Sequence, residues 1–237
     1  MADSSKIAAS DSAVVRCAFT VDVEDYFQVE AFARCVDRAG WDQHELRVER
    51  STQAVLDLLD DRKVSGTFFV LGWVAERLPQ LVREIARRGH EIASHGMSHR
   101  QVFTQQREEF QRETRASRRL LQDLSQQPVD GYRAATYSIT NRSMWALDVL
   151  CEEGFRYDSS IFPIRHDNYG IPGATAHPHR LATPGGAYIV EFPITTARVL
   201  GLNLPVAGGG YFRLFPYALT RWGLRRALVQ RHSAVFY

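Results

Sequence analysis

The sequence has few of the features that mark secreted or membrane-spanning proteins. Among its 237 residues are only three cysteines, Cys17, Cys35 and Cys151, and they are too scattered to hold a metal together. We expect reduced, mostly buried thiols, which favours the cytoplasm. The N-terminus "MADSSKIAASDSAVV" lacks the basic start and apolar core of a signal peptide. No apolar run approaches the roughly 20 residues that span a bilayer. The expected location is the cytoplasm or the inner face of the inner membrane.

A strong excess of one charge is also missing. The formal net charge is +2, with both signs mixed along the chain, which gives no argument for nucleic acid or an anionic membrane as partner. Hydrophobic residues make up 45% of the chain and charged residues 24%, an ordinary globular composition. We expect a disordered tail over residues 1–12 and one catalytic domain over residues 13–237.

Apolar runs alternate with amphipathic segments along the chain. "VVRCAFTVDVED", "SGTFFVLG" and "HEIAS" are typical of buried strands, while residues 51–61 and 105–124 have helical periodicity. Ser51 is the expected cap of the first helix. Residues 163–186 and "VAGGGYF" are expected to be loops. Alternation of this kind predicts βα units and a mainly parallel sheet, and ending on the strand "AVFY" suggests a truncated α/β barrel.

Polar side chains gather where these predicted strands end. Asp22, Glu24 and Asp25 close the first strand, and His95 and His99 follow the third. Because the carboxyl ends of parallel strands meet at one rim, we expect these groups to converge there with others from later strands. Those others are Arg133, Asp158 and Glu191; Glu191 either enters the site or accepts hydrogen bonds from the backbone.

Two imidazoles and one carboxylate form a common catalytic site for a divalent metal. His95 and His99 would be neutral ligands, and a second carboxylate, Asp22, would take a proton from a water whose pKa the metal lowers. Arg133 would pair with Asp22 and orient it. An H-x-x-x-H pair alone is more often structural, and Gly96 excludes the zinc-protease pattern. The acid cluster on the preceding strand nevertheless favours metal binding.

These stretches resemble the polysaccharide deacetylase family, carbohydrate esterases that share the chitooligosaccharide-deacetylase homology domain. "FTVDVEDYF" is similar to the family's first motif, "GHEIASHGMSH" to its histidine motif and "GYRAATYS" to its arginine motif. The similarity is closest to the branch associated with exosortase-type exopolysaccharide loci, through "TFFVLGWVAER", "EFPITT" and "LPVAGGGYFRLFPYALTR". It covers about residues 14–237.

The resemblance implies a distorted (β/α) barrel and metal-dependent removal of N-acetyl groups from a sugar polymer. The family's base falls on Asp22, and its histidine ligands fall on His95 and His99. Its carboxylate ligand falls on Glu24 or on Asp25, and the sequence does not choose between them. Arg133 matches the arginine that positions the base. The implied metal is Zn²⁺, with Co²⁺, Ni²⁺ or Mn²⁺ as alternatives.

Further roles follow from the same resemblance. Asp158 matches an acid that supports the general-acid histidine, and a backbone amide near Thr136 would stabilise the oxyanion. Tyr26, Thr136 and Tyr137 are the expected substrate-binding residues, although Tyr26 and Phe27 suit core packing equally well. In two places the chain departs from the family: Ala135 replaces a proline, and the segment carrying the general-acid histidine is missing. We therefore expect metal binding with poor turnover.

Two other functions remain open from the sequence. The same residues would serve an amidohydrolase that cleaves a small amide, and a closed pocket instead of an open groove would indicate it. A non-catalytic sugar-binding component of an exopolysaccharide apparatus is the third reading. The expected partner is an N-acetylated polysaccharide or oligosaccharide, with no nucleic acid and no transmembrane segment; the oligomeric state is open.

Overall fold

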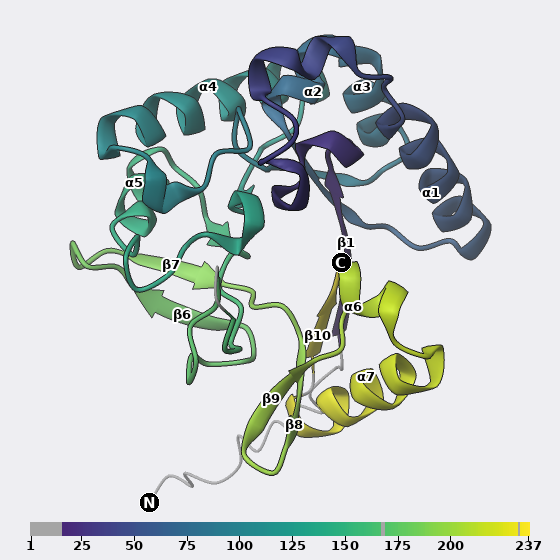
Figure 1. Cartoon of the computed structure of the whole chain (residues 1–237), viewed down its shortest axis with the longest axis vertical. Helices are drawn as coiled ribbons and strands as arrows, with labels where there is room; N and C mark the ends of the chain where they lie inside the picture. Colours follow the sequence, from purple (N-terminus) through teal and green to yellow (C-terminus); the bar gives the residue numbers. More distant parts are fainter. Residues whose placement is uncertain (1–15, 167–168, 232) are drawn as a thin grey trace, which may run out of the picture.

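The computed structural model describes residues 16–166, 169–231 and 233–237. The tail expected over residues 1–12 lies outside this range. Most described elements belong to one curled sheet with helices along its outer side (Figure 1). None of the helices in the described ranges is both long enough and apolar enough to cross a membrane.

The sheet has eight strands in the order β10-β1-β2-β3-β4-β5-β7-β6. Neighbouring strands are parallel except β6, which runs antiparallel to β7 at one edge. Because β10 and β6 are the two edges, the barrel stays open, and the predicted distorted (β/α) barrel is confirmed in this form. The strands are β1 (Arg16–Val23), β2 (Thr67–Val70), β3 (Glu91–Ser94), β4 (Gly131–Tyr132), β5 (Tyr157–Asp158), β6 (His179–Ala182), β7 (Tyr188–Glu191) and β10 (Ser233–Phe236).

Five helices form an arc outside this sheet (Figure 1). The central strands read as continuous apolar runs because the sheet is covered on both faces; Phe68 and Val70 of β2, for example, are fully buried. The helices bury one face each against it, with Leu56, Val82 and Leu121 completely enclosed. They are α1 (Val48–Arg62), α2 (Gly72–Arg77), α3 (Pro79–Arg87), α4 (Arg107–Ser125) and α5 (Ala146–Glu152).

Helix α1 begins before the expected capping residue. It starts at Val48, and Ser51 lies inside its first turn. The cap comes instead from Asp25, whose Oδ2 accepts hydrogen bonds from the backbone N–H groups of Arg47 (2.7 Å) and Val48 (2.9 Å). A cap supplied by a residue 23 positions upstream leaves no local pattern in the helix sequence, so the Ser51 prediction was wrong.

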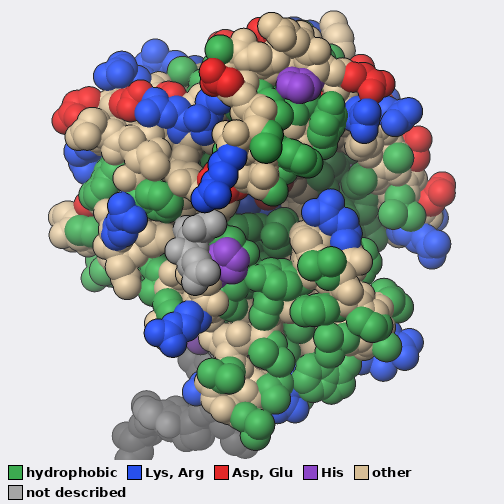
Figure 2. Space-filling view, in the orientation of Figure 1, with side chains coloured by type: hydrophobic (Ala, Val, Ile, Leu, Met, Phe, Trp, Pro, Cys, Tyr) green, Lys and Arg blue, Asp and Glu red, His purple; other side chains and the backbone are tan. Residues whose placement is uncertain are grey.

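The C-terminal part contains elements that the sequence did not predict. Residues 163–186, expected to be a loop, include β6, and a hairpin of β8 (Thr196–Val199) and β9 (Leu202–Pro205) lies outside the main sheet. The glycine-rich stretch, expected to be a loop, is partly helical, because α6 spans Gly209–Leu214. Helix α7 (Tyr217–Arg231) follows, where the sequence does favour a helix. Figure 2 shows apolar side chains gathered over this part of the surface.

The cysteines differ from the expectation as well. Cys17 and Cys35 are exposed and Cys151 is half-buried, all as free thiols. The prediction of mostly buried thiols is therefore wrong for the first two. Cys17 lies near the start of β1, and Cys35 follows a short irregular turn, so neither is covered by a helix.

Candidate active site

Three predicted metal ligands lie together at the carboxyl ends of β1 and β3. Glu24 directly follows β1, and His95 and His99 follow β3. One ligand atom from each lies within 4.8 Å of the others. The Nε2 atoms of His99 and His95 are 2.6 Å and 3.7 Å from Oε2 of Glu24. The histidines are buried, and the Glu24 side chain is 19% exposed, so the cluster opens to the surface on the carboxylate side.

The backbone fixes which nitrogen of His95 faces this cluster. Its Nδ1 lies 2.8 Å from the carbonyl oxygen of Arg133, a group that only accepts hydrogen bonds. Nδ1 therefore carries the proton, and Nε2 presents its lone pair toward Glu24. Metal-binding histidines are commonly oriented by such a hydrogen bond from the other ring nitrogen.

Helix α2 holds the loop between the two histidines at close range. The backbone N–H groups of Gly72 and Trp73 donate to the carbonyl oxygens of Gly96 (2.8 Å) and Met97 (2.9 Å). A Cβ on Gly72 would lie 2.3 Å from Sδ of Met97, so only glycine allows this approach. Gly96 has φ of 76°, a left-handed conformation that glycine adopts without strain. The loop is therefore preformed by its packing.

A second support comes from Arg38 in the long connection between β1 and α1. Its Nε donates to the carbonyl oxygen of Ser98 and its Nη2 to that of His99, both at 3.1 Å. His99 itself has φ of 51°, an uncommon conformation for a residue with a side chain. Arg38 thus helps hold a ligand in a backbone conformation that costs free energy.

These residues fit a divalent metal ion. Oε2 of Glu24 is buried and has no hydrogen-bond partner among the described residues, even though two imidazole nitrogens lie nearby. Buried polar atoms are nearly always satisfied, so this oxygen needs a further partner. Burial raises the pKa of the Glu24 carboxyl, but the adjacent His99 and His95 imidazoles outweigh it and lower the pKa well below its usual range. Two imidazoles and one ionised carboxylate suit zinc or a similar ion.

Asp25, the other carboxylate that the sequence left open, lies outside this cluster. One of its oxygens accepts from the N–H of Tyr26 at 2.9 Å, and the other caps α1. The side chain is only 2% exposed and its acceptor positions point at backbone donors. Asp25 is a structural residue that joins the end of β1 to the start of α1, and Glu24 is the carboxylate that faces the histidines.

The proposed base, Asp22, is paired as expected. Its Oδ1 accepts a hydrogen bond from Nη1 of Arg133 at 2.7 Å; Arg133 is fully buried, while 13% of the Asp22 side chain is exposed. Arg133 donates further to Oγ1 of Thr20 (3.0 Å) and to the Ser159 carbonyl and hydroxyl (3.2 and 2.9 Å). The guanidinium stacks on Phe69 at 3.9 Å. These contacts fix the guanidinium of Arg133, which in turn holds the carboxylate of Asp22 in one orientation.

The expected substrate-binding residues differ in their exposure to solvent. Tyr26 is 39% exposed beneath the guanidinium of Arg47, whereas Phe27 is buried in the core. Thr136 and Tyr137 both have left-handed backbone conformations, with φ of 55° and 52°. The Tyr137 ring is 6% exposed and packs between Phe162, Tyr169 and Tyr237, so its side chain cannot meet a substrate in this structure.

Asp158 and Glu191 form a buried pair away from the metal ligands. They are register partners on β5 and β7, and both are fully buried. Asp158 accepts from the hydroxyl (2.5 Å) and the N–H (3.2 Å) of Ser160, and Glu191 from the N–H of Ile161 (3.1 Å). Burial raises the pKa of Asp158 to about 6, and burial together with the nearby Asp158 charge raises that of Glu191 well above its usual value. Because two adjacent buried carboxylate charges disfavour each other, we expect the pair to share one proton at neutral pH.

This shared proton makes a pH-dependent contribution to stability. Carboxyls with raised folded-state pKa values stabilise the fold below their unfolded pKa, and the contribution is lost as pH rises through about 6. The side chain of Glu191→Gln is neutral at every pH. We therefore expect this variant to lose about 1–3 kcal/mol less unfolding free energy than the wild type as the pH rises. Urea unfolding at pH 4.5 and 7.5 measures it, with the exposed Glu49→Gln as control. Parallel pH curves for wild type and Glu191→Gln would refute the shared proton.

Three supporting residues escaped the sequence analysis. Arg38 begins a short 3-10 helix 61 positions before His99, and nothing in its surroundings marks it. Thr20 and Ser159 contact Arg133, and a signal for them did exist. Thr20 lies in β1 two residues before Asp22, and Ser159 directly follows Asp158, so the same argument extended to small hydroxyl side chains would have found them.

Two known families match successive parts of the chain. Residues 39–154 match the family described as "Polysaccharide deacetylase", and residues 159–237 match "Domain of unknown function (DUF3473)". Residues 22 and 24 precede the first match, and Arg133, His95 and His99 lie within it. The candidate site is therefore built from both the matched segment and the strand before it.

Curated relatives cover only part of this chain. A chitooligosaccharide deacetylase from Sinorhizobium fredii is 33% identical over 99 residues, which are 42% of this chain and 44% of that protein. A peptidoglycan-N-acetylglucosamine deacetylase from Bacillus cereus is 46% identical over 48 residues, 20% of this chain and 22% of that protein. The aligned stretch thus spans less than half of each relative.

Solved structures share the fold over a longer range. A protein from Mycobacterium smegmatis, assigned as a polysaccharide deacetylase, superposes with a TM-score of 0.65 at 24% identity, covering 94% of this chain and 76% of its own. A CE4 family pseudoenzyme from Bacillus anthracis superposes with a TM-score of 0.52 at 9% identity, covering 94% and 54%. At these identities the likeness establishes the fold alone.

Proposed function

Since residues 39–154 match the polysaccharide deacetylase family, we propose that this protein is a metal-dependent hydrolase that removes N-acetyl groups from a polysaccharide. The proposal rests on one observation: two groups of side chains, the predicted metal ligands and the predicted base with its arginine, lie at the same rim of the barrel. Glu24, His95 and His99 converge on one point, and Asp22, held by Arg133, lies close enough that its charge raises the pKa of His95 against the effect of burial.

Each of these residues has a separate role in the proposed hydrolysis. Glu24, His95 and His99 would hold a divalent ion, which would lower the pKa of water and polarise the acetyl carbonyl. Asp22 would accept the proton of the attacking water at its carboxylate, and the departing amine would take up a proton as acetate leaves. Arg133, fixed by Thr20, Ser159 and Phe69, keeps that carboxylate aimed in one direction. The strained backbone at Thr136 supports the proposed oxyanion amide, because strain of this kind concentrates at functional sites.

The substrate class follows from the relatives. The S. fredii protein is named for chitooligosaccharides and the B. cereus protein for peptidoglycan N-acetylglucosamine. Both names describe N-acetylated saccharides, and we extend that class to this chain, with Zn²⁺ as the first metal to test and Co²⁺, Ni²⁺ and Mn²⁺ as alternatives. A role in exopolysaccharide biosynthesis, a cytoplasmic location and one catalytic domain over residues 13–237 belong to the same proposal.

The test combines metal content with acetate release. Purified wild-type protein is loaded with Zn²⁺, dialysed, analysed by mass spectrometry for metal, and incubated with chitotetraose while acetate is measured. About one ion per chain and acetate release that stops on adding a chelator would support the proposal. Metal without acetate from this substrate would leave a metal-binding protein of another activity or a sugar-binding component. A chain that retains no metal would refute the site.

A matched pair of alanine variants makes this test specific. We expect Glu24→Ala to lose the metal, because it removes the only carboxylate facing the histidines among the described residues. Asp25→Ala should keep the metal and instead lower the free energy of unfolding by about 1–2 kcal/mol, the usual value of a helix cap. Metal lost from Asp25→Ala and kept by Glu24→Ala would reverse the assignment.

A further inference from the structure

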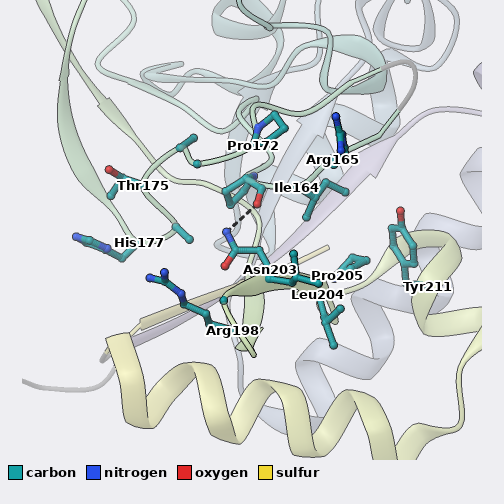
Figure 3. Close-up of a pocket in the computed structure, with 16 residues that line it drawn as sticks. Ile164, Arg165, Pro172, Thr175, His177, Arg198, Asn203, Leu204, Pro205 and Tyr211 are labelled. Carbon is teal, nitrogen blue, oxygen red and sulfur yellow. Dashed lines mark hydrogen bonds between the residues drawn. The ribbon is translucent and has the colours of Figure 1, made fainter.

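The C-terminal part of the chain contains a cavity of about 840 Å³ that the catalytic residues do not use. One wall is formed by Pro163–Arg165 and Pro172–His177, and the other is the β8–β9 hairpin with Tyr211 of α6 (Figure 3). Asn203 joins the walls, since its Nδ2 donates to the carbonyl oxygen of Pro163 at 2.8 Å. The volume lies within the range of sites that enclose small ligands.

The cavity is lined by positive charge. Arg198 of β8 lies near His177 at one end of the cavity and Arg165 lies at the other end (Figure 3). No aspartate or glutamate is among the lining residues that the structure describes. Both arginine side chains are exposed, and neither forms an ion pair within the described ranges. Two exposed guanidinium groups at the two ends of one cavity create a field that attracts anions.

The surrounding sequence strengthens this field. From Phe192 to Tyr237 there are six arginines and not one acidic residue, whereas the whole chain has a net charge of only +2. Figure 2 accordingly shows acidic side chains over the upper part of the molecule, and apolar and basic ones over the C-terminal elements. The charge is therefore separated between the two parts of the chain.

The cavity also offers an apolar face. Ile164, Leu204 and Pro205 lie beside Tyr211 on its inner side. Apolar and aromatic side chains of this kind pack against the C–H faces of sugar rings. A ligand that combines a sugar ring with a negative charge matches both surfaces at once.

A layer of aromatic rings connects this cavity to the proposed catalytic residues. The hydroxyl of Tyr211 lies 3.4 Å from that of Tyr169. Tyr169 packs on Tyr137 with ring centroids 6.1 Å apart, and the Tyr137 ring lies 5.8 Å from the guanidinium carbon of Arg133. Tyr211 of the cavity and the Asp22–Arg133 pair are thus joined through one packed cluster of tyrosine rings.

We propose that this cavity binds the carboxylate of an acidic sugar, so that the substrate is an N-acetylated polysaccharide that also contains uronate units. The inference rests on the proposed function for the role of the bound sugar. Arg198 donates charge-assisted hydrogen bonds to a carboxylate at one end of the cavity and Arg165 to a second carboxylate at the other end, while the sugar rings between them pack against Ile164 and Leu204. The catalytic residues then act on an acetamido sugar elsewhere on the same chain.

Binding of two matched oligosaccharides tests this directly. Hyaluronan hexasaccharide alternates glucuronate with N-acetylglucosamine, whereas chitohexaose contains N-acetylglucosamine alone. Titration calorimetry at 50 mM NaCl should show hyaluronan binding about 10- to 100-fold more tightly than chitohexaose, as expected for one or two charged hydrogen bonds. The double variant Arg165→Gln/Arg198→Gln should lose this preference.

The control removes the same charge elsewhere. Arg112→Gln/Arg119→Gln changes two exposed arginines of α4 and should keep the preference for hyaluronan. Equal affinity of the wild type for both oligosaccharides, or a preference that survives in Arg165→Gln/Arg198→Gln, would overturn the inference. Acetate release from chitotetraose without any hyaluronan preference would leave the proposed function standing alone. A preference without acetate release would leave an acidic-sugar site on a protein of another activity.

Discussion

Replacing Asp22 with asparagine is expected to lower acetate release by about 100- to 10,000-fold, the usual contribution of a general base, while metal content stays at one ion per chain. Asparagine keeps the shape of the side chain and an oxygen for the hydrogen bond from Arg133. It cannot accept the proton of the attacking water. Because Asp22 is not among the three clustered ligands, the metal should remain.

The choice of substrate separates the two proton transfers in this reaction. An amide must have its leaving nitrogen protonated, whereas 4-methylumbelliferyl acetate releases a stable phenolate without a proton. The Asp22→Asn defect should therefore appear with both chitotetraose and the aryl acetate. A variant that retains more than a third of wild-type activity on the aryl acetate would exclude Asp22 as the base.

The second large effect concerns stability. Arg133→Met should lower the free energy of unfolding by about 3–5 kcal/mol, because it leaves a largely buried carboxylate without its partner. The same change removes the hydrogen bonds to Thr20 and Ser159 and the stacking on Phe69. Methionine fills much of the volume, so most of the loss should come from the uncompensated charge.

A double-mutant cycle with Asp22→Asn measures how much of that loss is the charge. Adding Asp22→Asn to Arg133→Met should restore part of the stability, since the unpaired carboxylate is then neutral. Urea unfolding of the four proteins gives the coupling free energy directly. Strict additivity of the two single changes would mean that Asp22 and Arg133 do not interact in the folded protein, contrary to their 2.7 Å hydrogen bond.

The sheet could be read from the sequence where strands are continuous apolar runs. β2 and β3 occur where "SGTFFVLG" and "HEIAS" predicted them, because both faces of these strands are covered. β6, β8 and β9 were missed. Their burial alternates or is partial, and they lie in segments rich in proline and glycine that locally favour turns. Edge and hairpin strands depend on tertiary partners that short windows do not contain.

The site was predictable as a group of residue types and not as a geometry. Alternation of strands and helices indicates that Asp22, Glu24, His95 and Arg133 share one rim, because parallel strands end together. The choice between Glu24 and Asp25 was not available, since it depends on the backbone N–H groups of Arg47 and Val48 lying beside Asp25. Contacts between residues more than 20 positions apart decide which carboxylate is free to bind metal.

The contacts of Arg38 also make the site depend on two distant segments of the chain. Its guanidinium spans about 60 positions of the chain to hold the Ser98 and His99 carbonyls. Closing a loop of that length has an entropic cost, so these contacts require that the rest of the fold brings both segments together. Under the proposed function, tight metal binding would require both segments to be folded, and the metal content of a preparation would then report the fraction of correctly folded chains.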